Sequence, residues 1–133
     1  MRILEYQEYA IHELNNKSKK LVKVEYEKPH IIFSSPTGSG KTYMMSEYLA
    51  LISSQMENLV FIWIAPRKLH IQSQNKIKKY NEKTNKINPI FFENISNNQL
   101  IENDVLFLNW ESINKKDNLI YRENEQDFYL EKI

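Results

Sequence analysis

One stretch of the chain, IIFSSPTGSGKTYMM from Ile31 to Met45, limits the possible folds more than any other part of the sequence. An apolar run leads into a loop that ends in Gly-Ser-Gly-Lys-Thr, and a run with helical spacing follows. The chain has 2 glycines, Gly38 and Gly40, and both lie in this loop. Average usage of about 7% would give roughly nine. Because glycine serves where the backbone takes positive φ or approaches a ligand closely, the sequence predicts a specialised strand-to-helix turn.

A strand, a glycine loop and a helix in this order are typical of phosphate binding, since the backbone N–H groups of the loop and the helix N-terminus attract anions. We expect Lys41 to lie on the β- and γ-phosphates of ATP and the Thr42 hydroxyl to bind Mg²⁺, which makes both candidate catalytic residues. The alternative is an ordinary turn with a solvated lysine, which the flanking strand and helix signals disfavour. The residues predicted to contact the nucleotide in this loop are Ser35, Pro36, Thr37, Gly38, Ser39, Gly40, Lys41 and Thr42.

The order of apolar and amphipathic segments predicts an α/β domain with a mainly parallel sheet, because strand patterns alternate with helix patterns. Helices are predicted at about 3–15, 41–53, 66–81 and 122–133, and strands at 21–26, 30–34, 59–65, 89–92 and 105–109. A solvated face is the first interpretation of the basic residues on the third helix and the loop after it, which are Arg67, Lys68, Lys76, Lys78, Lys79, Lys83 and Lys86.

Composition narrows the class of protein. The length of 133 residues suits one domain or part of one, and the net charge of +1 favours no class of partner. The chain has no cysteine, which excludes disulfides and Cys-ligated metals and fits a reducing cytosol. The longest apolar run, at about 59–66, is far short of the roughly 20 residues of a membrane span, so no membrane partner is predicted.

An ATPase with such a loop also needs an apolar strand that ends in Asp, usually followed by Glu, to support Mg²⁺ and orient water. Asp104, Asp117 and Asp127 are the chain's aspartates, none directly follows an apolar strand, and no Asp-Glu pair occurs. We therefore expect residues 1–133 to be the N-terminal part of an ATPase domain, incomplete at the C-terminus, and inactive alone.

A GTPase is an alternative because Asn-Lys-Lys-Asp at 114–117 matches the guanine-reading pattern N-K-x-D. A GTPase also needs Asp-x-x-Gly between the two motifs, and no glycine follows Gly40. The match is therefore interpreted as accidental.

The glycine loop, SPTGSGKT at 35–42, resembles the form found in superfamily 2 helicases, in which a small residue replaces the first glycine. LEYQEYAIHEL at 4–14 resembles the helicase Q-motif region, in which a glutamine amide reads adenine, and Gln7 is the matching residue. IWIAPRKLHIQSQ at 62–74 resembles motif Ia, a strand-to-helix junction that touches the nucleic-acid backbone. Arg67 stands there in the position of a threonine.

VLFLNWESINKKDNLIYRENE at 105–125 resembles a segment of the helicase-like restriction subunit of type III restriction-modification enzymes. In that setting its polar residues would face a DNA track, although Trp110 is also compatible with a core position. The residues that the motif Ia and Asn-Trp-Glu resemblances place on DNA are Pro66, Arg67, Lys68, Gln72, Asn109, Trp110 and Ser112.

The resemblance implies a three-layer RecA-like P-loop domain, part of an ATP-dependent DNA helicase or translocase, with ATP, Mg²⁺ and DNA as ligands. It also implies a partner subunit that recognises and methylates the DNA site. Two alternatives stay open: another P-loop enzyme such as a nucleotide kinase, and a truncated nucleotide-binding protein without catalysis.

Overall fold

The structure is a computed structural model that describes residues 3–23, 28–83, 85–95 and 97–113. Its elements in chain order are α1 (Glu5–Leu21), α2 (Lys41–Gln55), β1 (Phe61–Ala65), α3 (Leu69–Asn81), β2 (Asn88–Phe91), the 3-10 helix η1 (Phe92–Asn94), β3 (Asp104–Asn109) and α4 (Trp110–Ile113). Strands and helices alternate over most of this length, as the sequence predicts.

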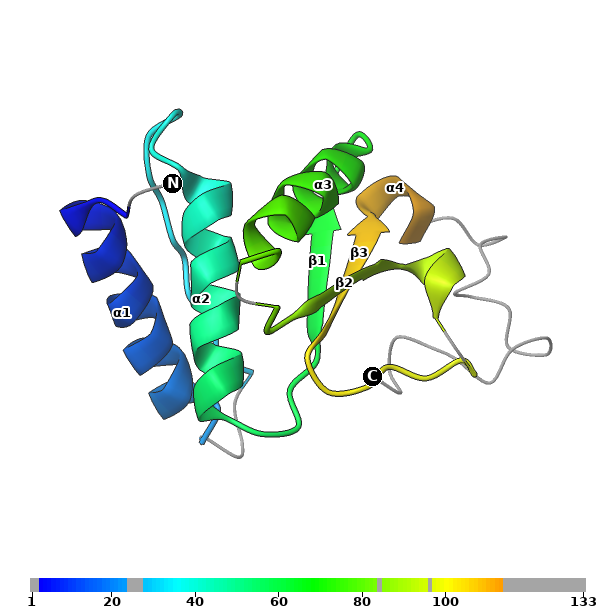
Figure 1. The fold of residues 1–133 in the computed structure, drawn as a ribbon, viewed down its shortest axis with the longest axis horizontal. Coiled ribbons are helices and arrows are strands. Elements are labelled where there is room, and N and C mark those ends of the chain that lie inside the picture. The colour runs from blue at the N-terminus through cyan, green and yellow to red at the C-terminus, as the bar shows by residue number, and fades with distance from the viewer. Residues whose placement is uncertain (1–2, 24–27, 84, 96, 114–133) are drawn as a thin grey trace.

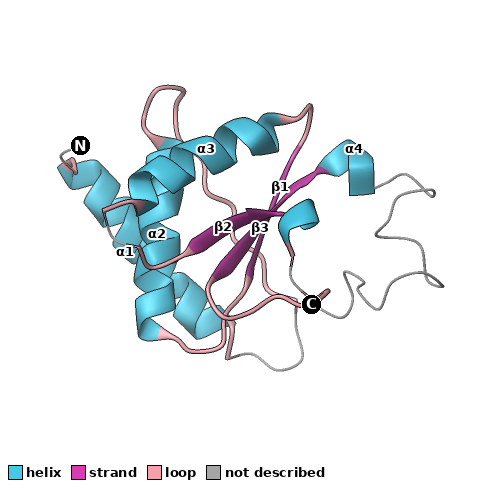
Figure 2. Ribbon diagram, turned by 45° about the vertical axis from the view of Figure 1, so that its right-hand side comes forward, coloured by secondary structure: helices cyan, strands magenta, loops and turns pink. Residues whose placement is uncertain are grey.

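The three strands form a parallel sheet in the order β1-β3-β2, with β3 in the centre. Figure 1 shows α1 and α2 side by side at one end of the molecule, α3 beside the sheet, and α4 directly after β3. Figure 2 shows the same grouping, with α1, α2 and α3 to one side of the strands and α4 to the other. The predicted fold class, a parallel α/β domain consistent with an incomplete RecA-like fold, is confirmed.

The two faces of β3 carry separate apolar clusters, because successive side chains of a strand point to opposite faces. On one face Val105 and Phe107 pack with Leu49 of α2 and Ile77 of α3. On the other face the cluster consists of Leu106, Leu108 and Ile113, with Ile90, Phe92, Ile95 and Leu100 packed against it. Helices therefore cover the first face, whereas η1, α4 and the segment after η1 cover the second.

The strand predicted at 30–34 is wrong. These residues have no regular secondary structure, and Ile32 is 94% exposed. A strand needs a neighbour that shares its backbone hydrogen bonds, and no strand in the described ranges pairs with this segment. The prediction from apolar composition failed because composition does not supply that neighbour.

Helix α1 is longer than predicted and ends at Leu21, so the polar run at 15–20 is helical. The reason is tertiary: Asn15 Nδ2 donates to Gln55 Oε1 at 2.9 Å, and the Ser18 and Tyr48 hydroxyls share a hydrogen bond of 2.5 Å. The strand predicted at 21–26 is wrong at its start, where Leu21 ends the helix; residues 24–26 lie outside the described residues.

Helix α3 begins at Leu69, three residues later than predicted, because Arg67 and Lys68 both take positive φ, of 53° and 60°. The strands predicted at 59–65, 89–92 and 105–109 are confirmed with slightly shifted ends. The helix predicted at 122–133 lies outside the described residues. Among the helices that are described, none is long and apolar enough to cross a membrane.

The loop between α3 and β2 gives a test of stability. The buried Asn81 side chain donates to the Ile87 carbonyl at 2.6 Å and accepts from the Lys86 and Ile87 N–H groups at 3.1 and 3.2 Å. We expect Asn81→Ala to lower the free energy of unfolding by about 2–3 kcal/mol in urea denaturation, since buried backbone groups lose their partner. The matched control is Asn75→Ala on the exposed side of α3; equal stability of the two variants would contradict this role.

Candidate functional site

The glycine loop, residues 35–40, is a compact turn that remains separate from the helix behind it. The Ser39 N–H donates to the Pro36 carbonyl at 3.2 Å, and the Ser35 and Ser39 hydroxyls are 2.6 Å apart. Gly38 and Gly40 take φ of 83° and 87°, the left-handed region predicted for them. Ser35, where the strict pattern has glycine, therefore braces the loop through its hydroxyl.

The N-terminal turn of α1 holds the loop by one carbonyl group. The Tyr6 hydroxyl and Gln7 Nε2 both donate to the Ser39 carbonyl, at 2.8 and 3.0 Å. Gln7 Oε1 accepts from the Leu4 N–H at 3.1 Å, so the Gln7 side chain is fixed at both ends and only 5% exposed. Because a trans peptide points its C=O and N–H in opposite directions, this contact turns the Gly40 N–H away from α1.

Lys41 and Thr42, the residues predicted to bind phosphate and Mg²⁺, come directly after the glycine loop. Gly40 is the N-cap of α2, and Lys41 and Thr42 are the first residues of the helix. Lys41 is exposed and Thr42 is half-buried, so the ammonium and hydroxyl groups stand at the positive end of a 15-residue helix. No cluster of three or more acidic, His or Cys side chains that could hold a metal occurs in the part that the structure describes.

The second candidate region is the basic turn, residues 66–68, at the carboxyl end of β1. Two successive non-glycine residues with positive φ are strained, by about 1–2 kcal/mol each. The Leu69 N–H donates to the Pro66 carbonyl at 3.0 Å and closes the turn. Pro66, Arg67 and Lys68 are all exposed.

Side chains from the last residue of β3 and from α4 hold the basic turn in this shape. Both Glu111 carboxylate oxygens accept from the Arg67 N–H, at 3.0 and 3.1 Å, and Asn109 Oδ1 accepts from the Lys68 N–H at 3.4 Å. The hydrogen bond from the Arg67 backbone N–H is the largest of the interactions that hold the pKa of Glu111 below its usual value. A hydrogen bond from the Glu111 backbone and the positive charge of Arg67 lower this pKa further. The strain in the turn is thus offset by contacts from Asn109, at the end of β3, and Glu111, in α4.

The structure brings several predicted site residues to one edge of the molecule. The carboxyl ends of the parallel strands β1 and β3 meet there, and in Figure 1 the N-terminus of α2, with the glycine loop before it, lies at the same end. Asn109 reaches the basic turn, whereas Trp110 is 50% exposed, so its alternative interpretation as a core residue is wrong. Gln72 is exposed on α3 and Ser112 is half-buried on α4.

Tyr6 and Glu111 are not among the site residues predicted from the sequence, although each adjoins a predicted one. Tyr6 precedes Gln7 in the Tyr-Gln pair, and Glu111 follows Trp110 in the Asn-Trp-Glu segment. Both bind backbone groups of a distant loop. A pattern of side chains cannot indicate such a partner, since every backbone offers the same groups.

The fold and the loop geometry together define a parallel α/β domain with a glycine loop that leads into a helix N-terminus. Residues 1–131 match the family described as type III restriction enzyme, res subunit. The chain belongs to this family, which confirms the predicted resemblance. Searches of the curated proteins and of the solved structures found no match.

The two glycines allow a matched test of the contact between α1 and the loop. A Cβ on Gly40 would lie 2.6 Å from Gln7 Nε2, whereas a Cβ on Gly38 would meet nothing within 4 Å. Both Ala variants carry a left-handed strain of about 1–2 kcal/mol. We expect Gly40→Ala to lower the free energy of unfolding more than Gly38→Ala, and to release Gln7 as seen by NMR of its side-chain amide. Equal effects of the two variants would show that the contact is unimportant.

The Glu111 contact predicts a pH effect. Because the contact lowers the carboxyl pKa, it stabilises the turn at pH above the usual Glu value and is lost as pH falls through the lowered pKa. NMR should show the Glu111 carboxyl and the Arg67 amide titrating together, at a pH below the usual pKa of a glutamate side chain. In Glu111→Gln the Arg67 amide shift should be independent of acidic pH. A titration of Arg67 that persists in this variant would exclude Glu111 as its cause.

Proposed function

We propose that this chain is the ATP-binding N-terminal part of an ATP-dependent DNA helicase or translocase, the restriction subunit of a type III restriction-modification system. The observation that carries the proposal is the placement of the glycine loop and the basic turn at one end of the molecule. Family membership supports it. In open parallel sheets, ligands bind outside the carboxyl ends of the strands.

In this proposal the glycine loop holds the phosphates of ATP. The Gly40 N–H, turned away from α1 by the Ser39 carbonyl contact, and the N-terminus of α2 supply N–H donors. Lys41 neutralises the β- and γ-phosphates, and Thr42 is the protein ligand of Mg²⁺, which would supply charge neutralisation when bound. Gln7 retains one N–H and one lone pair beyond its hydrogen bonds to Leu4 and Ser39, enough to pair with adenine.

The basic turn and the polar residues after β3 are proposed to bind the DNA backbone. Arg67 and Lys68 are exposed, and their backbone is held by Glu111 and Asn109, so the two side chains start from a fixed position. Phosphate contacts of this kind position a protein on DNA without reading its sequence. A subunit that recognises and methylates the site is the proposed partner.

We further propose that the chain is one part of a larger sheet whose acidic motif is not among residues 1–133. The support is an edge strand with apolar side chains exposed on one face of the sheet. β1 is an edge strand in the described sheet, and its side chains Ile62 and Ile64 are 39% and 46% exposed. Apolar surface of this kind is favourable to bury, by about 25 cal/mol per Å². Without an acidic residue to orient water, the chain alone would bind ATP but not hydrolyse it.

Two variants of the 133-residue chain test both ligands. Lys41→Ala should weaken binding of a fluorescent ATP analogue with Mg²⁺ at least about tenfold and leave DNA affinity unchanged. Arg67→Ala should weaken binding of a short DNA, lower its salt slope by about 1, and leave ATP affinity unchanged. Loss of both affinities in either variant would mean that the residue supports the fold, and absence of ATP binding by the unaltered chain would refute the proposal.

A further inference from the structure

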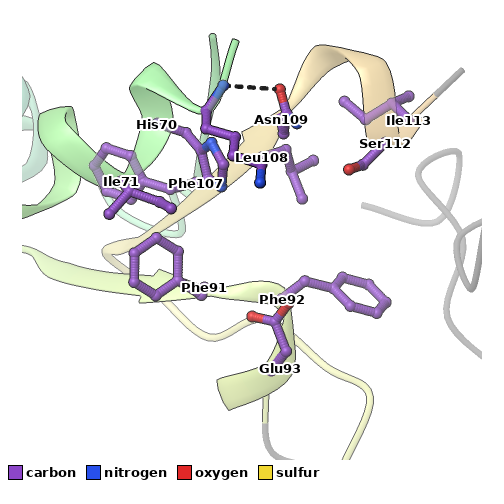
Figure 3. A pocket seen from close by; sticks show the side chains of 11 residues that line it. His70, Ile71, Phe91, Phe92, Glu93, Phe107, Leu108, Asn109, Ser112 and Ile113 are labelled. Atoms are coloured by element: carbon purple, nitrogen blue, oxygen red, sulfur yellow. Dashed lines mark hydrogen bonds between the residues drawn. The ribbon is translucent and has the colours of Figure 1, made fainter. Parts of the chain in front are cut away.

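A cavity of about 350 Å³ opens at the same edge of the sheet, beside the basic turn. It lies between the first turn of α3, the end of β2 with η1, and the junction of β3 with α4. Figure 3 shows His70 and Ile71 on one side, Phe91, Phe92 and Glu93 below, and Asn109 and Ser112 on the far side. Its volume falls at the lower end of the range of about 300–1,000 Å³ that is usual for ligand pockets.

Aromatic rings form much of the wall of the cavity. The rings of His70 and Phe91 meet edge to face, with centroids 6.0 Å apart. Phe91 and Phe92 are both half-buried, so part of each side chain stays accessible. Unstacked nucleobases bind proteins chiefly by stacking on such rings.

The polar groups of the cavity suit the remaining parts of a nucleotide. Lys68 stands where the cavity meets the basic turn and would attract a phosphate. Glu93 is exposed on η1, and a carboxylate accepts hydrogen bonds from the exocyclic amino group of a base. The Ser112 hydroxyl can donate or accept. Positive charge thus lies toward the basic turn, and the acceptor lies on η1.

We propose that this cavity is a subsite for one unstacked nucleobase of a DNA strand whose phosphates lie on the basic turn. The inference rests on the proposed function and deepens it, because the DNA track then holds a base as well as a backbone. A free small ligand fits the observations less well, since the lysine that lines the cavity, Lys68, belongs to the exposed basic turn, which suits the backbone of a longer strand.

The test uses a single-stranded oligodeoxynucleotide and the same oligonucleotide with abasic sites, bound to the 133-residue chain. The subsite predicts tighter binding of the oligonucleotide that carries bases, by at least about fivefold. Ile71→Trp, on the cavity wall and 45% exposed, should fill the cavity and remove this difference. Asn75→Trp, exposed on the same helix outside the cavity, is the matched control and should keep it.

Ser112→Leu narrows the cavity from α4 and gives a second variant should Ile71→Trp fail to fold. Arg67→Ala should weaken the binding of both oligonucleotides by the same factor, because the substitution removes a phosphate contact only. Equal binding of the two oligonucleotides, or a base preference that survives both cavity variants, would overturn the subsite while the proposed DNA track stands. Failure of the unaltered chain to bind either oligonucleotide would refute the DNA track, and the subsite with it.

Discussion

Burial of β3 on both faces is the constraint on which the rest of the described structure depends. Val105 and Leu106 are fully buried on opposite faces, and Phe107 and Leu108 nearly so. Removing such side chains from water is the largest favourable contribution to folding. The strand can be buried in this way only with a paired neighbour on each side and a cover on each face. β1 and β2, α2 and α3, and the residues from η1 to α4 fulfil these needs.

Parallel pairing with β3 then decides where chemistry can occur. Because β1 and β3 run in the same direction, Ala65 and Asn109 are register partners, and the loops after them leave side by side. The basic turn is thereby placed within reach of Asn109 and Glu111. The glycine loop is held in a comparable manner by the first turn of α1. In both places two side chains from a remote segment hold backbone groups of a turn, which leaves the exposed charged side chains available for a ligand.

The sequence was sufficient for those elements whose signal is local. β1 and β3 are continuous apolar runs, of which β3 is buried on both faces, and α2 is predicted from the glycine loop before it. The errors arose where a distant partner decided the structure. Asn15 and Ser18 have low helix propensity, but their hydrogen bonds to α2 keep them helical. The left-handed backbone of Arg67 depends on its hydrogen bond to Glu111.

The site poses a mechanical question, because the described sheet does not contain the segment before the glycine loop. The loop is attached to α1 and α2, and α2 meets the sheet together with α3. Tyr43, near the start of α2, contacts Tyr80 of α3 edge to face at 5.2 Å, and Leu49 packs with Ile77 further along. The same helix α3 begins at the basic turn and lines the cavity with His70 and Ile71. Because close-packed helices shift as units and not by local deformation, a displacement of the glycine loop is expected to reach the basic turn through α2 and α3. The contacts of α3 with α2, more than those of the sheet, are then where the two proposed ligands would sense each other.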